Sequence, residues 1–232
     1  GYPETVFMDE ELIQRTLQSY FDVMLFRDIV ERHAISTPLV LKHFLKKILN
    51  NISNKLSVHK FYNEMKSQGM TTSKNAIYEF LDHAIDCFLL FTIYPYEPSL
   101  SKQQMKTRKV YAVDSGLVNA VTYRYSEDKG KLLENVVFMH LVREESTVHY
   151  LNDKYECDFI VQKNSKIIQA IQVCLTLRDA ATRQRELRGL LHAAERFNLP
   201  EAYIITLDEE DDFEMEGKKI FVRPCWKWLL TR

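Results

Sequence analysis

The chain has 232 residues, 46% of them hydrophobic, which fits one large or two small folded domains and excludes a disordered protein. Its 31 basic and 32 acidic residues leave a net charge of −1, which excludes an overall electrostatic attraction to nucleic acid or to an anionic membrane. Four scattered cysteines without a C-x-x-C pair argue against a zinc site, and no apolar run approaches the roughly 18 residues that span a bilayer, so we expect a reduced, cytoplasmic protein without a membrane partner.

The first third of the sequence is predicted to be helical. Apolar residues between Leu12 and Ile29 recur at spacings of three and four, the pattern of a long helix with one buried face. A second helix follows Pro38, whose fixed φ suits a first helical turn. A third, shorter helix covers residues 57–65.

A helix-turn-helix pattern is predicted next. A Gly-containing turn leads into a fourth helix, which Thr71, Thr72 or Ser73 can cap. Two extended runs follow, at residues 88–96 and 109–113, and a polar loop joins them. Helix, turn, capped helix and two-stranded hairpin is the order of a winged helix-turn-helix.

The pattern changes after Gly130. An amphipathic helix, three strands, a second amphipathic helix and two further strands are predicted in that order, and an acidic loop at residues 208–216 separates the last two strands. This order gives a mixed sheet covered by helices. The sequence therefore predicts an α/β domain from about residue 130 and an α+β chain as a whole.

The winged helix pattern provides candidate groups for nucleic-acid binding. Polar side chains at the start of the fourth helix and basic ones in the hairpin loop are able to reach phosphates or base edges: Thr72, Ser73, Lys74, Asn75 and Tyr78, and Lys102, Lys106, Arg108 and Lys109. Glu79 and Asp82 share the exposed helix face and repel phosphate. Contact with DNA and contact with a protein therefore both stay open.

The α/β half provides candidate metal ligands. Glu134 lies on its first helix, Asp158 within its second strand and Gln172 on its third. Oxygen ligands from a helix and adjacent strands can converge at one sheet edge, as Mg²⁺-dependent phosphodiester cleavage requires. The alternative is that Glu134 and Asp158 make local structural contacts. Arginines at the start of the last long helix can meet phosphate or the acidic loop 208–216: Arg178, Arg183, Arg185 and Arg188.

Several strings together resemble one widespread prokaryotic ATPase family. They are Gly-Tyr-Pro-Glu at 1–4, Phe-Arg-Asp-Ile-Val at 26–30, Lys-Val-Tyr-Ala-Val-Asp-Ser-Gly-Leu at 109–117, Gly-Lys-Leu-Leu-Glu-Asn-Val-Val at 130–137, Glu-Cys-Asp-Phe-Ile-Val at 156–161 and Ile-Gln-Val at 171–173. Members of that family carry an AAA-type P-loop module, a helical lid, a winged helix and a domain of unknown function similar to PD-(D/E)XK nucleases.

The resemblance implies a helical lid segment at residues 1–36, a winged helix domain at 37–128 and a nuclease-like domain at 129–232. The N-terminal P-loop module would be missing, because the sequence contains no Gly-x-x-x-x-Gly-Lys-Ser/Thr loop. ATP and Mg²⁺ are thus expected as cofactors of the full-length protein and none of this fragment. Pro3 resembles a proline near the adenine in related ATPases, and it is the single candidate nucleotide contact.

The resemblance also assigns the nuclease motif residue by residue. Glu134 matches the helix acid, Asp158 the strand acid, Gln172 the next acid, and Cys174 stands where the catalytic lysine is expected. A thiol cannot replace an ammonium group that stabilises developing negative charge. The leading expectation is a DNA- or protein-binding module with an inactive nuclease-like domain. The alternatives are a metal-dependent DNA endonuclease and a purely protein-interacting module.

Overall fold

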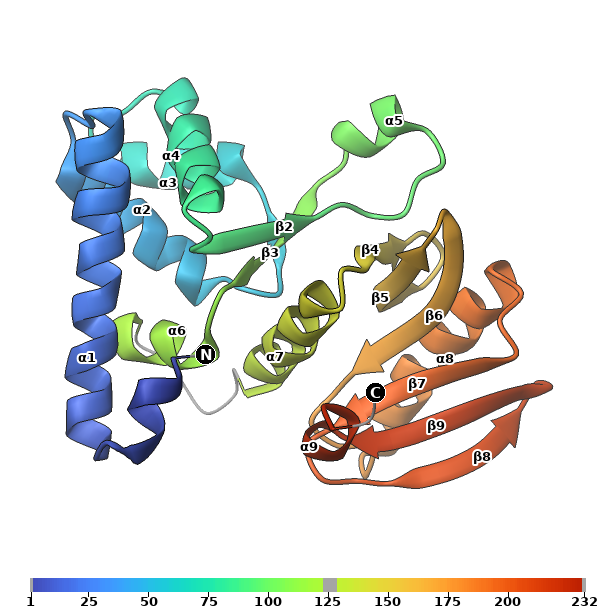
Figure 1. Ribbon diagram of the computed structural model, residues 1–232. Coiled ribbons are helices and arrows are strands. Elements are labelled where there is room, and N and C mark those ends of the chain that lie inside the picture. The colour runs from blue at the N-terminus through green and yellow to red at the C-terminus, as the bar shows by residue number, and fades with distance from the viewer. Residues whose placement is uncertain (1, 123–128, 231–232) are drawn as a thin grey trace. The chain divides into compact units, whose positions relative to one another are not determined.

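The computed structural model describes residues 2–122 and 129–230, and the chain divides into two compact units. The first unit comprises residues 1–92 and 107–125, and the second comprises residues 93–106 and 126–232. Figure 1 shows the helical first unit and the second unit with its large sheet. The predicted α+β class, with a mixed sheet in the second half, is confirmed.

The first unit is built mainly of helices. They are the 3-10 turn η1 (Pro3–Phe7), α1 (Glu10–Val23), the π-helical η2 (Met24–Glu31), α2 (Pro38–Asn50), α3 (Val58–Ser67), α4 (Lys74–Asp86) and α6 (Ser115–Val121). A small sheet adds β1 (Lys55–Leu56), β3 (Arg108–Ala112) and β2 (Leu90–Ile93), in that spatial order. The predicted long first helix is therefore two segments, because the hydrogen-bond pattern changes to π-type at Met24.

The helix caps follow the sequence signals. Ser73 caps α4 by accepting a hydrogen bond from the backbone N–H of Ala76 at 3.0 Å, and Pro38 occupies the first turn of α2. Gly69 has φ of +78°, as the predicted turn before α4 requires. These local signals depend on neighbouring residues alone, and this is why they could be predicted.

The second unit is a six-stranded sheet with the order β4-β5-β6-β7-β9-β8. Its strands are β4 (Thr147–Asn152), β5 (Glu156–Lys163), β6 (Lys166–Val173), β7 (Glu201–Thr206), β8 (Asp211–Met215) and β9 (Lys218–Pro224), and its helices include α5 (Leu100–Gln104), α7 (Lys129–Arg143), α8 (Ala180–Arg196) and α9 (Cys225–Trp228). The β6–β7 and β7–β9 pairs are parallel and the others antiparallel. No helix in the described ranges is both long and apolar enough to cross a membrane.

The acidic segment that the sequence predicts as a loop is instead largely strand β8. It pairs antiparallel with β9 across a tight turn at Glu216 and Gly217, which have φ of +52° and +71°. Four of its five residues are exposed, and Phe213 is partly buried against the core. An edge strand with one solvated face tolerates its acidic residues, and this is why its charge obscured the strand.

Helix α8 packs against the sheet through a close backbone contact. Leu187, Leu190 and Ala194 share one core cluster with residues of β5, β6 and β7. A Cβ atom added to Gly189 would lie 2.1 Å from the carbonyl oxygen of Glu156. Glycine at this position therefore lets the helix approach β5 more closely than any other residue would allow.

Candidate functional site

The candidate site lies where strands β5 and β6 stop pairing. Their antiparallel register runs to the pair Phe159 and Ile171, so Asp158 and Gln172 are the next residues to face each other. There the backbone N–H of Asp158 donates to Oε1 of Gln172 at 3.2 Å, and the backbone N–H of Val173 donates to Oδ2 of Asp158 at 3.0 Å. Side chains thus replace the backbone partners that the separating strands lose.

A buried polar chain continues from these strands to α8. The side-chain amide of Gln172 donates to Oε2 of Glu186, and Nε of Arg185 donates to Oε1 of the same carboxylate at 3.0 Å. Glu186 is only 4% exposed, while the side chain of Arg185 is 72% exposed. The hydrogen bond to Glu186 raises the pKa of Arg185, so the buried carboxylate is held by a fully charged partner.

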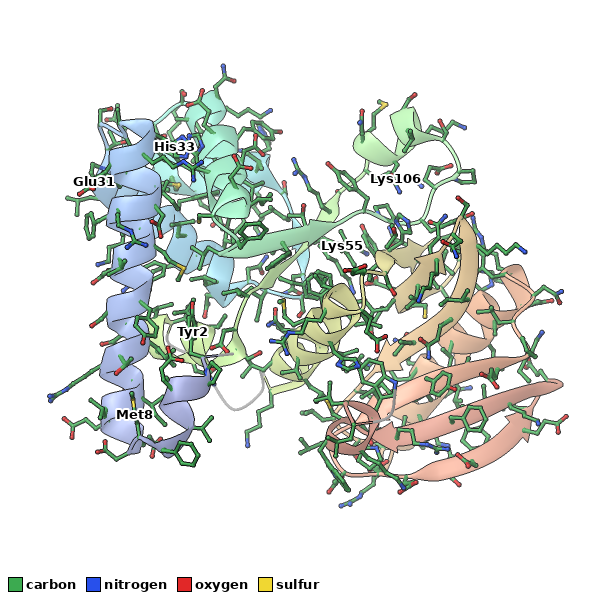
Figure 2. All side chains as sticks on the ribbon, viewed as in Figure 1. Tyr2, Met8, Glu31, His33, Lys55 and Lys106 are labelled. Atoms are coloured by element: carbon green, nitrogen blue, oxygen red, sulfur yellow. The ribbon has the colours of Figure 1, made fainter. Side chains whose placement is uncertain are left out.

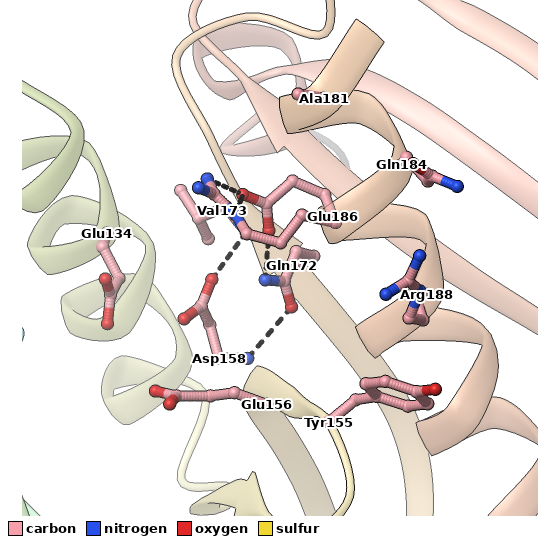
Figure 3. A pocket seen from close by; sticks show the side chains of 11 residues that line it. Glu134, Tyr155, Glu156, Asp158, Gln172, Val173, Ala181, Gln184, Glu186 and Arg188 are labelled. Atoms are coloured by element: carbon pink, nitrogen blue, oxygen red, sulfur yellow. Dashed lines mark hydrogen bonds and ion pairs between the residues drawn. The ribbon is translucent and has the colours of Figure 1, made fainter.

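These groups line an open hollow of about 490 Å³, which we call the site pocket. Its wall includes Glu134 of α7, Glu156 and Asp158 of β5, and Tyr155 just before that strand, together with residues of β6 and α8. Figure 3 shows Glu134 on one side of the pocket and the linked set of Asp158, Gln172 and Glu186 on the other. All three residues predicted as catalytic therefore line the same pocket.

The pocket has the donor types for a hard divalent cation but not the arrangement. Carboxylate and amide oxygens are the ligands that Mg²⁺ prefers. However, Oε1 of Gln172 and Oδ2 of Asp158 already accept backbone hydrogen bonds. Within residues 2–122 and 129–230, no three histidine, cysteine or acidic side chains are grouped closely enough to hold a metal ion. Glu134 and Asp158 are therefore not part of a preformed three-ligand metal site.

Cys174, at the position of the expected lysine, lies in the hydrophobic core beneath α8. It is 7% exposed and belongs to the same cluster as Leu187 and Leu190. Burial, with a smaller effect of nearby Glu186, raises the pKa of its thiol to about 12. The residue is therefore a neutral packing group near neutral pH and carries no charge into the pocket.

The two residues of α8 that complete the polar chain, Arg185 and Glu186, were not among the predicted catalytic residues. Glu186 accepts the hydrogen bond from Gln172, and Arg185 pairs with the Glu186 carboxylate. In the sequence both residues look like ordinary members of a charged helix start. The signal that identifies Glu186 is its position one turn before Gly189, on the face that the glycine brings against β5. A glycine in the middle of a helix marks a packing contact of this kind.

The predicted nucleic-acid residues of α4 are at the helix start. Lys74, Asn75 and Tyr78 are exposed, and Thr72 is partly exposed. Ser73 is exposed as well, and its Oγ accepts the capping hydrogen bond while its O–H remains able to donate. All five predicted side chains of this helix start are therefore at least partly accessible.

The basic residues of the predicted wing differ in burial and are divided between the two units. Lys109 is buried at 3% exposure in β3, and Arg108 beside it is partly buried. Lys102 and Lys106 belong to the second unit, where Lys106 lies 3.1 Å from the Glu97 carboxylate (Figure 2). Packing of β3 explains why Lys109, which looks exposed in the sequence, is not.

The segment before Lys106 packs on strand β4. The backbone N–H of Tyr96 donates to the carbonyl of Tyr150 at 2.7 Å, and the N–H of Tyr150 donates to the carbonyl of Tyr94 at 3.3 Å. The ring of Tyr96 contacts Phe197 edge-on, with centroids 4.8 Å apart. The loop thus covers the open edge of β4 and is anchored at its base.

Pro3 is exposed at the first position of the η1 turn. The neighbouring ring of Tyr2 packs against Tyr20 with centroids 5.0 Å apart, and burial raises the pKa of Tyr2. This contact fixes the segment on α1. Pro3 itself is left on the surface.

Comparison with known proteins finds two families, both described only as domains of unknown function. The model of DUF8612 matches residues 1–128, and the model of DUF4143 matches residues 129–228. An uncharacterized protein of Methanocaldococcus jannaschii is 31% identical over all of this chain and 54% of its own length. An uncharacterized protein of Haemophilus influenzae is 26% identical over 97% of the chain and 55% of its own length.

The chain thus spans about half the length of the curated relatives it matches. No solved structure matches it.

Proposed function

The chain belongs to the DUF8612 family, and we propose that its second unit is a binding module that has kept the nuclease-like pocket but does not cleave phosphodiester bonds. A second part of the proposal concerns the whole protein. The resemblance of the sequence to AAA-type ATPases, and relatives about twice as long, support a longer protein with a P-loop module. In that protein the chain would couple ATP hydrolysis to a nucleic-acid or protein partner through a winged helix and the module.

The burial of Cys174 is the observation that carries the proposal. Phosphodiester cleavage by the related enzymes needs a cation that stabilises negative charge beside the metal ligands. At this position the chain has a neutral thiol with a pKa of about 12, packed among leucines. Gln172 and Glu186 in turn bond to each other and so stabilise the fold.

A second candidate function is metal-dependent cleavage with a substitute cation. Arg185 supports it, because its guanidinium lines the pocket beside Gln172 and Glu186. An arginine binds an anion well, but its pKa prevents it from giving or taking a proton near neutral pH. It therefore suits charge stabilisation and does not suit general base chemistry.

The test is turnover of labelled linear, branched and single-stranded DNA by the 232-residue chain with millimolar Mg²⁺ or Mn²⁺. We expect no cleavage above the level of a metal-free control. Cleavage that disappears in both Asp158→Ala and Arg185→Gln would contradict the proposal and establish the second candidate. Cleavage that persists in both variants would indicate a contaminating nuclease.

The ATPase part is tested separately on the full-length protein. We expect ATP hydrolysis that depends on the lysine of a P-loop outside this chain. A full-length protein with no such loop, or one that neither binds nor hydrolyses ATP, would contradict this part and leave the module proposal intact.

A further inference from the structure

A second hollow, of about 550 Å³, runs along the exposed side of α8, and we call it the α8 groove. Its walls are the turn before β5, with Lys154 and Tyr155, the helix itself, with Arg183 and Arg188, and the turn between β8 and β9, with Met215. The groove and the site pocket share Tyr155, Gln184 and Arg188 along their walls. The two hollows therefore adjoin and offer an extended path.

Three cations of the groove have no acidic partner. Arg183, Arg188 and Lys154 are exposed, and none forms an ion pair with any carboxylate that the structure describes. Each instead lies over an aromatic ring: Arg183 is 5.4 Å from the centroid of Phe213, and Arg188 and Lys154 are 5.5 and 5.3 Å from that of Tyr155. Ring contacts of this kind hold a cation in place and leave its N–H donors for an anion.

The other cations nearby on α8 and just before it behave differently. Arg178 lies 3.3 Å from Glu209 and 3.8 Å from Asp208, and Arg196 pairs with Asp153. Both arginines are neutralised within the chain, and Arg178 pairs with the acidic segment 208–216, one of the two partners that the sequence predicts for it. Arg183, Arg188 and Lys154 are therefore the cations of this region whose charge can bind an anion from outside the chain.

The groove also offers apolar surface next to its cations. Met215, which is 41% exposed, lines it together with the ring of Tyr155, and the buried side chains of Leu187 and Leu191 lie beneath them. Proteins that bind single-stranded nucleic acid combine a positive groove for the backbone with aromatic surface for the bases. A small anion would need no such surface.

We propose that the α8 groove binds single-stranded nucleic acid, with phosphates at Arg183, Arg188 and Lys154 and bases along the wall that Tyr155 and Met215 form. The inference rests on the proposed function of the second unit as a binding module. Two acidic residues, Glu195 and Glu216, also line the groove. Glu195 lies seven residues beyond Arg188, about two helical turns along, and Glu216 lies in the β8–β9 turn beside Met215. The strand is therefore placed on the half of the groove next to the site pocket.

The acidic residues of the site pocket limit where the strand can run. Glu134, Glu156 and Asp158 line that pocket and repel phosphate. The phosphates are therefore expected to stay on the groove side of Arg188. Binding in the groove needs no divalent cation, so it can be measured in EDTA, apart from any cleavage.

The experiment is fluorescence anisotropy of a labelled 20-nucleotide oligo-dT, and of a duplex of the same length, with the 232-residue chain in EDTA. We expect tighter binding of the single strand and an increase in Kd of at least about tenfold in Arg183→Gln/Arg188→Gln. The slope of log K against log salt should fall by about 1.4, since each lost single-strand phosphate contact contributes about 0.7. Tyr155→Leu should raise Kd roughly tenfold.

Arg178→Gln is the matched control. It makes the same substitution, half of the change in the double variant, at an exposed arginine of the same region that is already paired with acidic residues. We expect at most about a twofold change in Kd, since a charge neutralised within the chain adds little to phosphate binding. Equal losses in the control and in the Arg183/Arg188 double variant would overturn the inference, because general charge would then explain the binding.

Other outcomes also overturn the inference. One is unchanged affinity in the double variant, and another is binding lost through Lys74→Gln alone, which would place the strand on the first unit. A third is no oligo-dT binding at low salt while poly-glutamate binds, which would identify an acidic protein partner. In each case the proposed function still depends on the separate cleavage assay with metal, so the two proposals can fail independently.

Discussion

The charged residues on the inner and outer sides of helix α8 differ in burial and in their partners. On the inner side, Glu186 is buried and bonded to Gln172 and Arg185, and Gly189 brings the helix against β5. On the outer side, Arg183 and Arg188 are exposed and lie over aromatic rings. A buried polar group needs hydrogen-bond partners within the protein, whereas water solvates an exposed cation until a ligand binds. The inner side therefore contributes to stability, and the outer side is the one that we propose for binding.

The largest effect is expected at the closest contact of the inner side. Gly189→Ala places a methyl group 2.1 Å from the Glu156 carbonyl oxygen, and neither backbone can move without separating α8 from the sheet. We expect a loss of about 3 kcal/mol in the free energy of unfolding, measured by denaturant titration.

Gly130→Ala is its control, because the new methyl group would meet only Leu175, at 3.8 Å, and helix propensity favours alanine. Similar losses in both variants would show that the close contact of Gly189 with Glu156 does not determine the stability.

A smaller loss is expected from the buried carboxylate. Glu186→Ala leaves the side-chain amide of Gln172 without its acceptor, at a cost of about 2 kcal/mol. Glu186→Gln keeps an oxygen for that amide and should lose less than half as much. Chemical unfolding measures both variants. Equal stability of the alanine variant and the parent would contradict a structural role for this polar chain.

Because the pKa of the Cys174 thiol is raised, we expect the free energy of unfolding to fall at alkaline pH. Its folded pKa of about 12 lies above the value of about 8.5 for a thiol in an unfolded chain. The unfolded state therefore releases its proton first, and the contribution of Cys174 is complete below about pH 8.5 and decreases as pH rises toward 12. Each pH unit within that window removes about 1.4 kcal/mol.

The check is to compare unfolding free energies at pH 8 and pH 10 in the parent chain and in Cys174→Ala. We expect the parent to lose about 1.4 kcal/mol or more relative to the variant over this interval. Parallel behaviour of the two proteins would mean that the thiol is more accessible than the structure shows.

The smallest effect is expected on the surface. Arg178→Gln removes ion pairs with Asp208 and Glu209, but the arginine side chain is 76% exposed. Solvent and salt screen such pairs, so we expect less than about 0.5 kcal/mol in thermal unfolding. A loss above 1 kcal/mol would mean that this arginine belongs with the structural residues of the inner side.

The candidate site could be predicted in part. Glu134, Asp158 and Gln172 were identified from family-like strings, and the structure brings all three to one pocket. Glu186 was not identified, because it lies 14 residues from Gln172 and only the packing of α8 brings them together. Lys109 was predicted as a basic contact, and the pairing of β3 buries it instead.

By itself the sequence determined the features that depend on near neighbours. These include a cap among residues 71–73, which the structure places at Ser73, the Gly69 turn, the amphipathic helices and the mixed α+β class. Capping, turn conformation and hydrophobic spacing act over a few residues. Only the tertiary structure decided which charges are satisfied. A sequence does not reveal whether a charged side chain contacts a partner or water. The distance between Glu186 and its partners depends on how closely α8 approaches β5.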